Sequence, residues 1–94
     1  MITFDPAKRE WTLQERGIDF ADAVTVFDGP TITREDDRFD YGEVRYITAG
    51  FLGNRMAIIV WTPRDVARHI ISMRFCHARE EKRWRKNLRE SPDE

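Results

Sequence analysis

The chain has 94 residues, of which 40% are hydrophobic and 35% charged, and its formal net charge is −1 at pH 7. This length and apolar content suit one domain with one core, expected at residues 1–90, followed by a disordered tail at residues 91–94. Because the sequence has neither an apolar run of roughly 18 residues nor a basic and then apolar start, we expect a cytoplasmic protein without a membrane span.

Charge is distributed unevenly along the chain. Residues 1–43 carry eleven acidic and five basic side chains, whereas residues 44–89 carry three acidic and eleven basic ones. Thirteen of the sixteen basic residues are arginine, whose planar charged fork suits phosphates and carboxylates. The basic second part predicts a nucleic acid or an acidic partner, and the alternative is that the two parts neutralise each other in the fold.

The first third of the chain predicts two helices that cover one face of a sheet. Residues 2–4 are too few to stand alone and are expected to extend a sheet edge. Asp5, followed by proline, is typical of a helix start, Trp11 is the expected apolar anchor of that helix, and Gly17 ends it. Apolar residues then recur at intervals of two to four, which predicts a second short helix at residues 19–28.

Four strands with short connections follow, which predicts an antiparallel meander. The first is expected at residues 31–35, and the alternation of residues 42–49 indicates a half-buried second strand. Residues 56–61 are continuously apolar, as in a central strand that is covered on both sides. The fold class is therefore α+β, with two N-terminal helices, a four-stranded antiparallel sheet and a C-terminal helix.

The last strand and the closing helix carry much of the positive charge. Simple alternation places Arg68 and Arg74 on one face of the strand, opposite Met73 and its apolar neighbours. The helix at residues 78–89 has few apolar residues, so it is expected to dock narrowly through Trp84 and Leu88. The single cysteine, Cys76, is expected to pack in the core, and no Cys or His cluster predicts a metal or another cofactor.

Several motifs occur in an order that is known from one protein family. They are Phe4-Asp5-Pro6, Gly17-Ile18-Asp19-Phe20, Val26-Phe27-Asp28, Tyr41-Gly42-Glu43 with Arg45, and Arg68-x-Ile70-Ile71-Ser72-x-Arg74 followed by Arg79-Glu80. From Phe4 to about Trp84 the chain resembles the BrnT toxins of bacterial type II toxin–antitoxin systems. The resemblance implies a RelE-like fold and ribonuclease activity against mRNA, free or held on the ribosome. It also implies a DNA-binding BrnA-type antitoxin as partner, in a heterotetramer.

Cleavage of RNA without a metal requires activation of the 2′-hydroxyl, stabilisation of charge on the phosphorus, and a proton for the leaving oxygen. The candidate catalytic residues are Arg45, Arg68, Arg74 and Glu80. The arginines would stabilise charge, whereas Glu80 is either the base or the group that orients an arginine. Candidates for RNA binding are Arg55, Arg79, Arg83 and Trp84. His77 is a weaker candidate because the family pattern has no histidine there, and His69 lies among core residues.

The chain departs from the BrnT pattern at three places. An Asn-x-x-Lys-His-Gly run is replaced by residues 12–17, which place Glu15 and Arg16 at the Lys and His positions. Phe75 follows the strand arginine where a basic residue is frequent, and Trp84 stands in place of a tyrosine. These departures keep a second hypothesis open, in which a weakened toxin acts as a binding module in an antitoxin repressor complex. A third reading is a freestanding RNA-binding domain.

Overall fold

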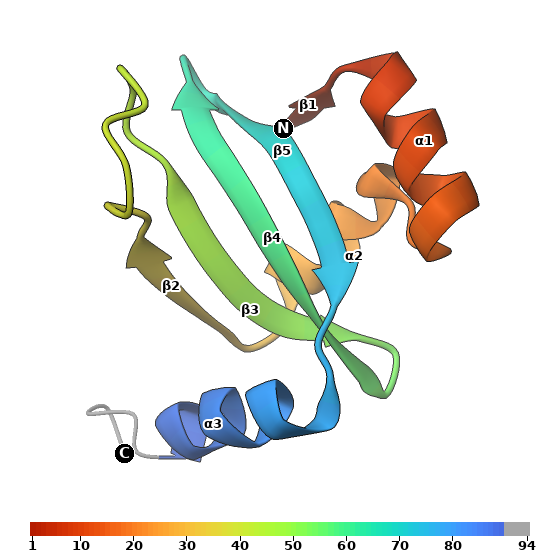
Figure 1. The fold of residues 1–94 in the computed structure, drawn as a ribbon, viewed down its shortest axis with the longest axis vertical. Coiled ribbons are helices and arrows are strands. Elements are labelled where there is room, and N and C mark those ends of the chain that lie inside the picture. Colours follow the sequence, from red (N-terminus) through yellow and green to blue (C-terminus); the bar gives the residue numbers. More distant parts are fainter. Residues whose placement is uncertain (90–94) are drawn as a thin grey trace.

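The computed structural model describes residues 1–89 and shows a five-stranded mixed sheet with three α-helices (Figure 1). The side chains of Leu88 and Arg89 and the expected tail at residues 91–94 lie outside this description. The elements in chain order are β1 (Ile2–Phe4), α1 (Pro6–Arg16), the 3₁₀ helix η1 (Phe20–Asp22), α2 (Ala23–Asp28), β2 (Thr31–Glu35), β3 (Tyr46–Leu52), β4 (Arg55–Arg64), β5 (Ala67–Phe75) and α3 (Ala78–Arg89). The α+β class is confirmed.

The sheet has the strand order β1-β5-β4-β3-β2. Strands β2 to β5 form the predicted antiparallel meander, and the bounds of β2 and α3 agree with the sequence. The predicted count of four strands is wrong, because β1 pairs in parallel with β5, with Ile2 opposite Arg68. β3 starts at Tyr46 rather than at residue 42, because a loop with a left-handed turn at Gly42, φ 72°, occupies the intervening residues.

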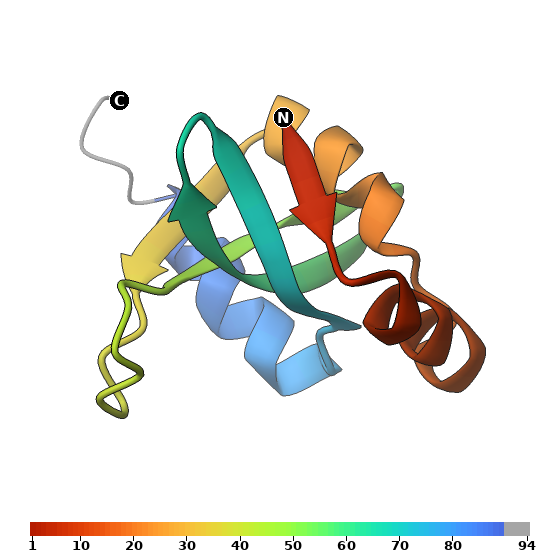
Figure 2. The ribbon, with the colours of Figure 1, turned by 90° about the horizontal axis from the view of Figure 1, so that it is seen from above.

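Helix α1 begins and ends as the sequence indicates but has a different anchor. Asp5 caps the Ala7 N–H at 3.0 Å, and Gly17 adopts a left-handed conformation, φ 68°, at the other end. Trp11, the expected anchor, is 55% exposed, whereas Thr12 is 3% exposed and is the buried residue of the helix. The helix lies beside the β1–β5 edge (Figure 2), so only a narrow strip of it is buried and a large side chain is not required.

Apolar clusters lie on both faces of the sheet. One cluster joins η1 and α2 to the central strands through Phe20, Val26 and Ile59, all 0% exposed. A smaller one, around Met56 and Ile58, receives Trp84 from α3. Figure 2 shows α3 on the opposite side of the sheet from η1 and α2. We call the two sides the α2 face and the α3 face.

A β-bulge in β5 changes which side chains share a face. Val60 pairs with Ser72 but Trp61 pairs with Ile70, so Ile71 is an extra residue without a partner in β4. Such an insertion reverses the alternation of side chains on its two sides. Ile70 is consequently buried with Met73 in the α2-face core, although they are three positions apart.

The bulge separates two arginines that the sequence analysis placed together. The Arg68 guanidinium lies over the Phe27 ring, 4.3 Å from its centroid, and therefore on the α2 face. Arg74 instead pairs with Glu80 of α3 on the α3 face. The predicted common face for Arg68 and Arg74 is wrong, because strict alternation ignores the extra residue.

Candidate functional site

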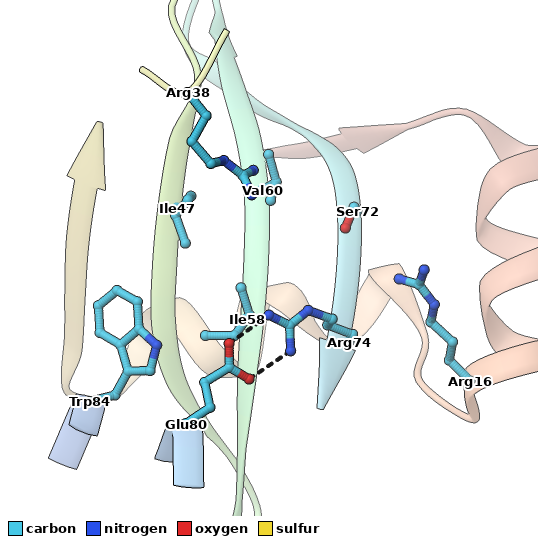
Figure 3. A pocket seen from close by; sticks show the side chains of 9 residues that line it. All are labelled: Arg16, Arg38, Ile47, Ile58, Val60, Ser72, Arg74, Glu80 and Trp84. Carbon is cyan, nitrogen blue, oxygen red and sulfur yellow. Dashed lines mark hydrogen bonds and ion pairs between the residues drawn. The ribbon is translucent and has the colours of Figure 1, made fainter. Parts of the chain in front are cut away.

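A pocket of about 330 Å³ lies on the α3 face (Figure 3). Its floor is apolar and comes from β3 and β4, through Ile47, Ile58 and Val60. Its remaining lining residues are Arg16, Arg38, Ser72, Arg74, Glu80 and Trp84, which come from α1, the β2–β3 loop, β5 and α3. Three arginine side chains from distant parts of the chain thus line one small pocket.

Arg74 and Glu80 form an ion pair with two hydrogen bonds at the pocket. Both terminal nitrogens of Arg74 donate to the Glu80 carboxylate, at 2.7 and 2.6 Å. The short link between β5 and α3 allows this pairing, since it sets the first turn of α3 beside the end of the strand. The Glu80 side chain is 15% exposed, and the hydrogen bond from Arg74 lowers its pKa to about 2. Glu80 is therefore a carboxylate at neutral pH, fixed in position by two charged hydrogen bonds.

Arg38 is held by a second carboxylate, Asp36, in the β2–β3 loop. Its Nε and one terminal nitrogen donate to Asp36 at 2.7 and 2.8 Å, and these hydrogen bonds are the main reason why the pKa of Asp36 falls to about 2. The guanidinium ends beside Val60 in Figure 3. Arg38 was not among the predicted site residues, because a charged loop carries no pattern that indicates where its side chains point.

Arg16 reaches the pocket from the last turn of α1. It donates to the Met73 carbonyl at 3.1 Å, and no ion pair to a carboxylate is found for it within residues 1–89. It stands where the BrnT pattern has histidine, and that departure is the one signal in the sequence that could have placed it here. The position that lost a titratable group thus supplies a permanent charge to the same pocket as Arg74.

Five predicted arginines do not line this pocket, and three of them lie outside α3. Arg45 precedes β3, where it pairs with Glu43 at 3.1 Å and lies over the Tyr41 ring. Arg68 is on the α2 face, as described above. Arg55 stacks on Phe75, which packs against the α2-face core.

The predicted helix residues divide between exposure and packing. Arg79 is exposed in the first turn of α3. Arg83 lines a neighbouring pocket together with Trp84 and Arg34. The Trp84 ring is covered by the Arg34 guanidinium, 4.9 Å from its centroid, and packs against the α3-face cluster. Trp84 is therefore the anchor of α3, as expected, and forms a wall shared by both pockets.

The histidines and the cysteine lie outside the pocket lining. His69 is hydrogen-bonded to Thr3 at 2.9 Å, and burial lowers its pKa. His77 is 71% exposed, with Nε2 4.0 Å from the Glu80 carboxylate. Cys76 is buried, and burial is the main reason why its pKa rises to about 12. In the part of the chain that the structure describes, His, Cys, Asp and Glu side chains form no cluster of three that could hold a metal ion.

The ion pairs decide between two readings of the uneven charge. Every pair among the described residues is local, and the most widely separated, Arg9 with Asp19, spans ten positions. Only the pair of Arg45 with Glu43, two positions apart, joins the acidic first part to the basic second part, so ion pairs among the described residues neutralise little of the uneven charge.

Sequence comparison agrees with the motifs. The model of the family "Ribonuclease toxin, BrnT, of type II toxin-antitoxin system" matches residues 4–80. The chain belongs to the BrnT family. This BrnT match includes every charged residue of the pocket and ends at Glu80, before most of α3. No curated protein matches the chain. Within the described residues, no helix has the length and apolar character needed to cross a membrane.

Proposed function

We propose that this BrnT-family chain is a toxin that cleaves single-stranded or ribosome-held mRNA at the α3-face pocket, without a metal. The observation that carries the proposal is the meeting of Arg16, Arg38 and Arg74 at one pocket, in a chain of a ribonuclease toxin family. Guanidinium groups fixed before the reaction stabilise developing charge on phosphate oxygens with little reorganisation.

Arg74 is the proposed main catalytic residue. Its two charged hydrogen bonds to Glu80 hold the guanidinium in place, and since no hydrogen bond from its Nε is found within residues 1–89, that N–H is proposed to bind a phosphate oxygen. In this scheme the RNA 2′-oxygen attacks phosphorus, the 5′-oxygen leaves with a proton, and Arg74 stabilises the charge that develops on the non-bridging oxygens. The product is then a 2′,3′-cyclic phosphate and a 5′-hydroxyl.

Glu80 is proposed as a positioning residue rather than as the base. A carboxylate whose pKa is about 2 has little tendency to take a proton from a hydroxyl at neutral pH. Neither His69 nor His77 is among the residues that line the pocket. We therefore assign the rate enhancement to charge stabilisation and substrate positioning, with water carrying the protons.

A BrnA-type antitoxin is proposed to neutralise the toxin by covering the α3 face. The type II toxin–antitoxin family supports an antitoxin partner, and a cover over the pocket would exclude RNA directly. We propose the heterotetramer implied by the BrnT resemblance as the form of this complex.

The proposal is tested with purified protein and a 5′-labelled single-stranded RNA in the presence of EDTA. We expect cleavage that continues in EDTA, ends that carry 2′,3′-cyclic phosphate, and loss of cleavage when the antitoxin is added. Intact labelled RNA in this assay, together with intact cellular RNA during growth arrest in cells that express the chain, would show that the toxin acts by another mechanism.

A second function is supported by the charge balance of the pocket. Two of its three guanidiniums are already paired with carboxylates, Arg38 with Asp36 and Arg74 with Glu80, which lowers the charge available to RNA. A weakened toxin of this kind would serve as a binding module in an antitoxin repressor complex. The two functions separate on wild-type protein: a binding module holds its antitoxin but neither slows growth nor cleaves RNA at any expression level.

A further inference from the structure

Asp36 is a deeply buried carboxylate that holds Arg38, one of the residues lining the pocket. Its side chain is 1% exposed, although it belongs to the long loop between β2 and β3. It accepts hydrogen bonds from the Arg38 side chain at 2.7 and 2.8 Å, from the Arg38 backbone N–H at 3.4 Å and from the Tyr41 hydroxyl at 3.2 Å. The Asp36 N–H also donates to the Arg45 carbonyl at 2.7 Å, which closes the loop at its base.

This arrangement holds Arg38 by one edge of its guanidinium. The edge formed by Nε and Nη2 faces Asp36, and no hydrogen bond from Nη1 is found within residues 1–89. The Arg38 side chain is 61% exposed, so its free edge is open to solvent at the pocket. Figure 3 shows this guanidinium over the sheet, on the opposite side of the pocket from the Arg74–Glu80 pair. The buried Asp36 carboxylate thus fixes the direction of the exposed Arg38 guanidinium.

The charged side chains that line the pocket, counted together with Asp36, the partner of Arg38, add up to an excess of one positive charge. Arg16, Arg38 and Arg74 contribute three, and Asp36 and Glu80 remove two. The Arg38 charge acts to lower the pKa of Arg74, against the larger effect of Glu80, so the two guanidiniums lie within electrostatic reach of each other. A net positive charge in a small pocket favours the binding of an anion there. One phosphodiester group carries the single negative charge that this pocket lacks.

The size of the pocket narrows the class of ligand. A volume of about 330 Å³ lies at the lower end of ligand pockets, roughly 300–1,000 Å³, and suits one nucleotide unit rather than a duplex. The apolar floor of Ile47, Ile58 and Val60 suits a sugar or base face beside the phosphate.

We propose that Arg38, aimed by the buried Asp36, is an additional phosphate-binding residue for single-stranded RNA at this pocket, with Asp36 as its positioning residue. The inference rests on the proposed function, since it names how that site holds its substrate. The alternative is that the Asp36–Arg38 ion pair only holds the β2–β3 loop closed. The two differ in what they predict for RNA affinity, salt dependence and catalysis.

The most informative variant is Asp36→Asn. A pocket that binds RNA through net charge alone and a pocket that depends on the position of Arg38 predict opposite changes in RNA affinity for it. The substitution raises the net charge of the pocket by one, so a purely electrostatic pocket would bind a labelled single-stranded oligoribonucleotide more tightly. We expect weaker binding, by roughly three- to tenfold, because the guanidinium loses its charged partner and its fixed direction. Tighter binding by Asp36→Asn would overturn the assignment of Asp36.

Arg38 itself is tested with a matched control on another part of the surface. Arg38→Ala is expected to weaken RNA binding about tenfold. It should also make the negative slope of log affinity against log salt concentration shallower by roughly 0.7, the value for one lost phosphate contact on a single strand. Arg64→Ala removes the same charge from the end of β4, outside the pocket, and is expected to change affinity by no more than about twofold. Equal effects of the two variants would overturn the inference.

Arg38→Lys covers the case in which Asp36→Asn does not fold. Lysine keeps the charge but lacks the fork that pairs edge-on with Asp36, so binding at low salt is expected to stay within about threefold while the KM for RNA rises roughly fivefold. A loop-closing role predicts a lower unfolding temperature with an unchanged salt slope and KM, and that result would overturn the proposal. If the wild type cleaves RNA and Arg38→Ala changes neither RNA affinity nor its salt dependence, the role of Arg38 is overturned and the proposed function is not. Specific binding through Arg38 without cleavage overturns the proposed function alone.

Discussion

The two faces of the sheet use the same strands for different purposes. On the α2 face the side chains of β4 and β5 enter an apolar core in which Phe20, Ile59 and Met73 are 0% exposed. On the α3 face the same strands support a pocket lined by guanidinium groups over an apolar floor. The larger apolar core thus lies on one face and the proposed site on the other. The following predictions test how completely the two are separated.

The largest effect on stability is expected on the α2 face. Phe20→Ala should lower the free energy of unfolding by about 3–5 kcal/mol, because its ring is fully buried and packs edge-on against Phe4, with centroids 5.9 Å apart. Urea unfolding followed by circular dichroism measures this loss. Trp11→Ala is the control, since Trp11 is 55% exposed and should cost no more than about 1 kcal/mol. Comparable losses in the two variants would contradict the assignment of the core.

The largest effect on activity is expected on the α3 face. Arg74→Ala should reduce the rate of RNA cleavage on the order of 10²-fold, the usual loss when one fixed donor to the transition state is removed. Arg68→Ala is the matched control, because it removes the same group from the same strand on the opposite face. We expect its cleavage rate to stay within roughly threefold of wild type, with a stability loss of about 0.5–1 kcal/mol from the lost stacking on Phe27. If Arg68→Ala is as inactive as Arg74→Ala, the two faces are not functionally separate.

A smaller effect is expected when the pH is lowered. The pKa values of Glu80 and Asp36 are about 2 in the folded chain, below the ordinary 4.5 and 3.8. A folded-state pKa below the unfolded one means that the stabilisation is complete above about pH 4.5 and is lost as the pH falls towards 2. We expect a combined loss of about 1–2 kcal/mol, reduced by solvent screening because the partners Arg74 and Arg38 are 41% and 61% exposed.

Urea midpoints at pH 7, 4.5, 3 and 2 measure this dependence. Glu80→Gln combined with Asp36→Asn should flatten the curve more than Asp19→Asn, whose carboxylate pairs with Arg9 away from the pocket. If Asp19→Asn flattens the curve more, the ion pair that responds most strongly to acid lies away from the pocket, and the prediction is contradicted. The comparison of the two faces therefore covers the effect of acid on stability as well as the effect of substitutions on activity.

Local features of the fold were readable from the sequence. The bounds of β2 and α3, the cap at Asp5 and the end of α1 at Gly17 follow from nearby residue types, and the structure confirms them. Trp11 was misjudged because the amount of surface that α1 buries depends on its place beside the sheet edge. Propensity and capping act within a few residues, whereas burial depends on the packing of whole elements.

The candidate site was only partly readable for the same reason. Arg74, Glu80 and Trp84 lie close together in the chain, and the structure brings all three to the α3-face pocket. Arg16 and Arg38 join them from α1 and from a loop, through tertiary contacts that no local pattern encodes. The separation of Arg68 from Arg74 depends on one unpaired residue, which alternation alone does not reveal. The catalytic and RNA-binding roles of these residues remain predictions for the experiments above.

Ile71 also bears on how related or engineered chains should be compared. Because this residue is extra in β5, the even-numbered side chains lie on the α2 face before it and on the α3 face after it. An alignment that gains or loses one position there pairs pocket residues of one protein with core residues of another. A chain shortened by that residue would keep all of its arginines, yet place a different set of them on the α3 face.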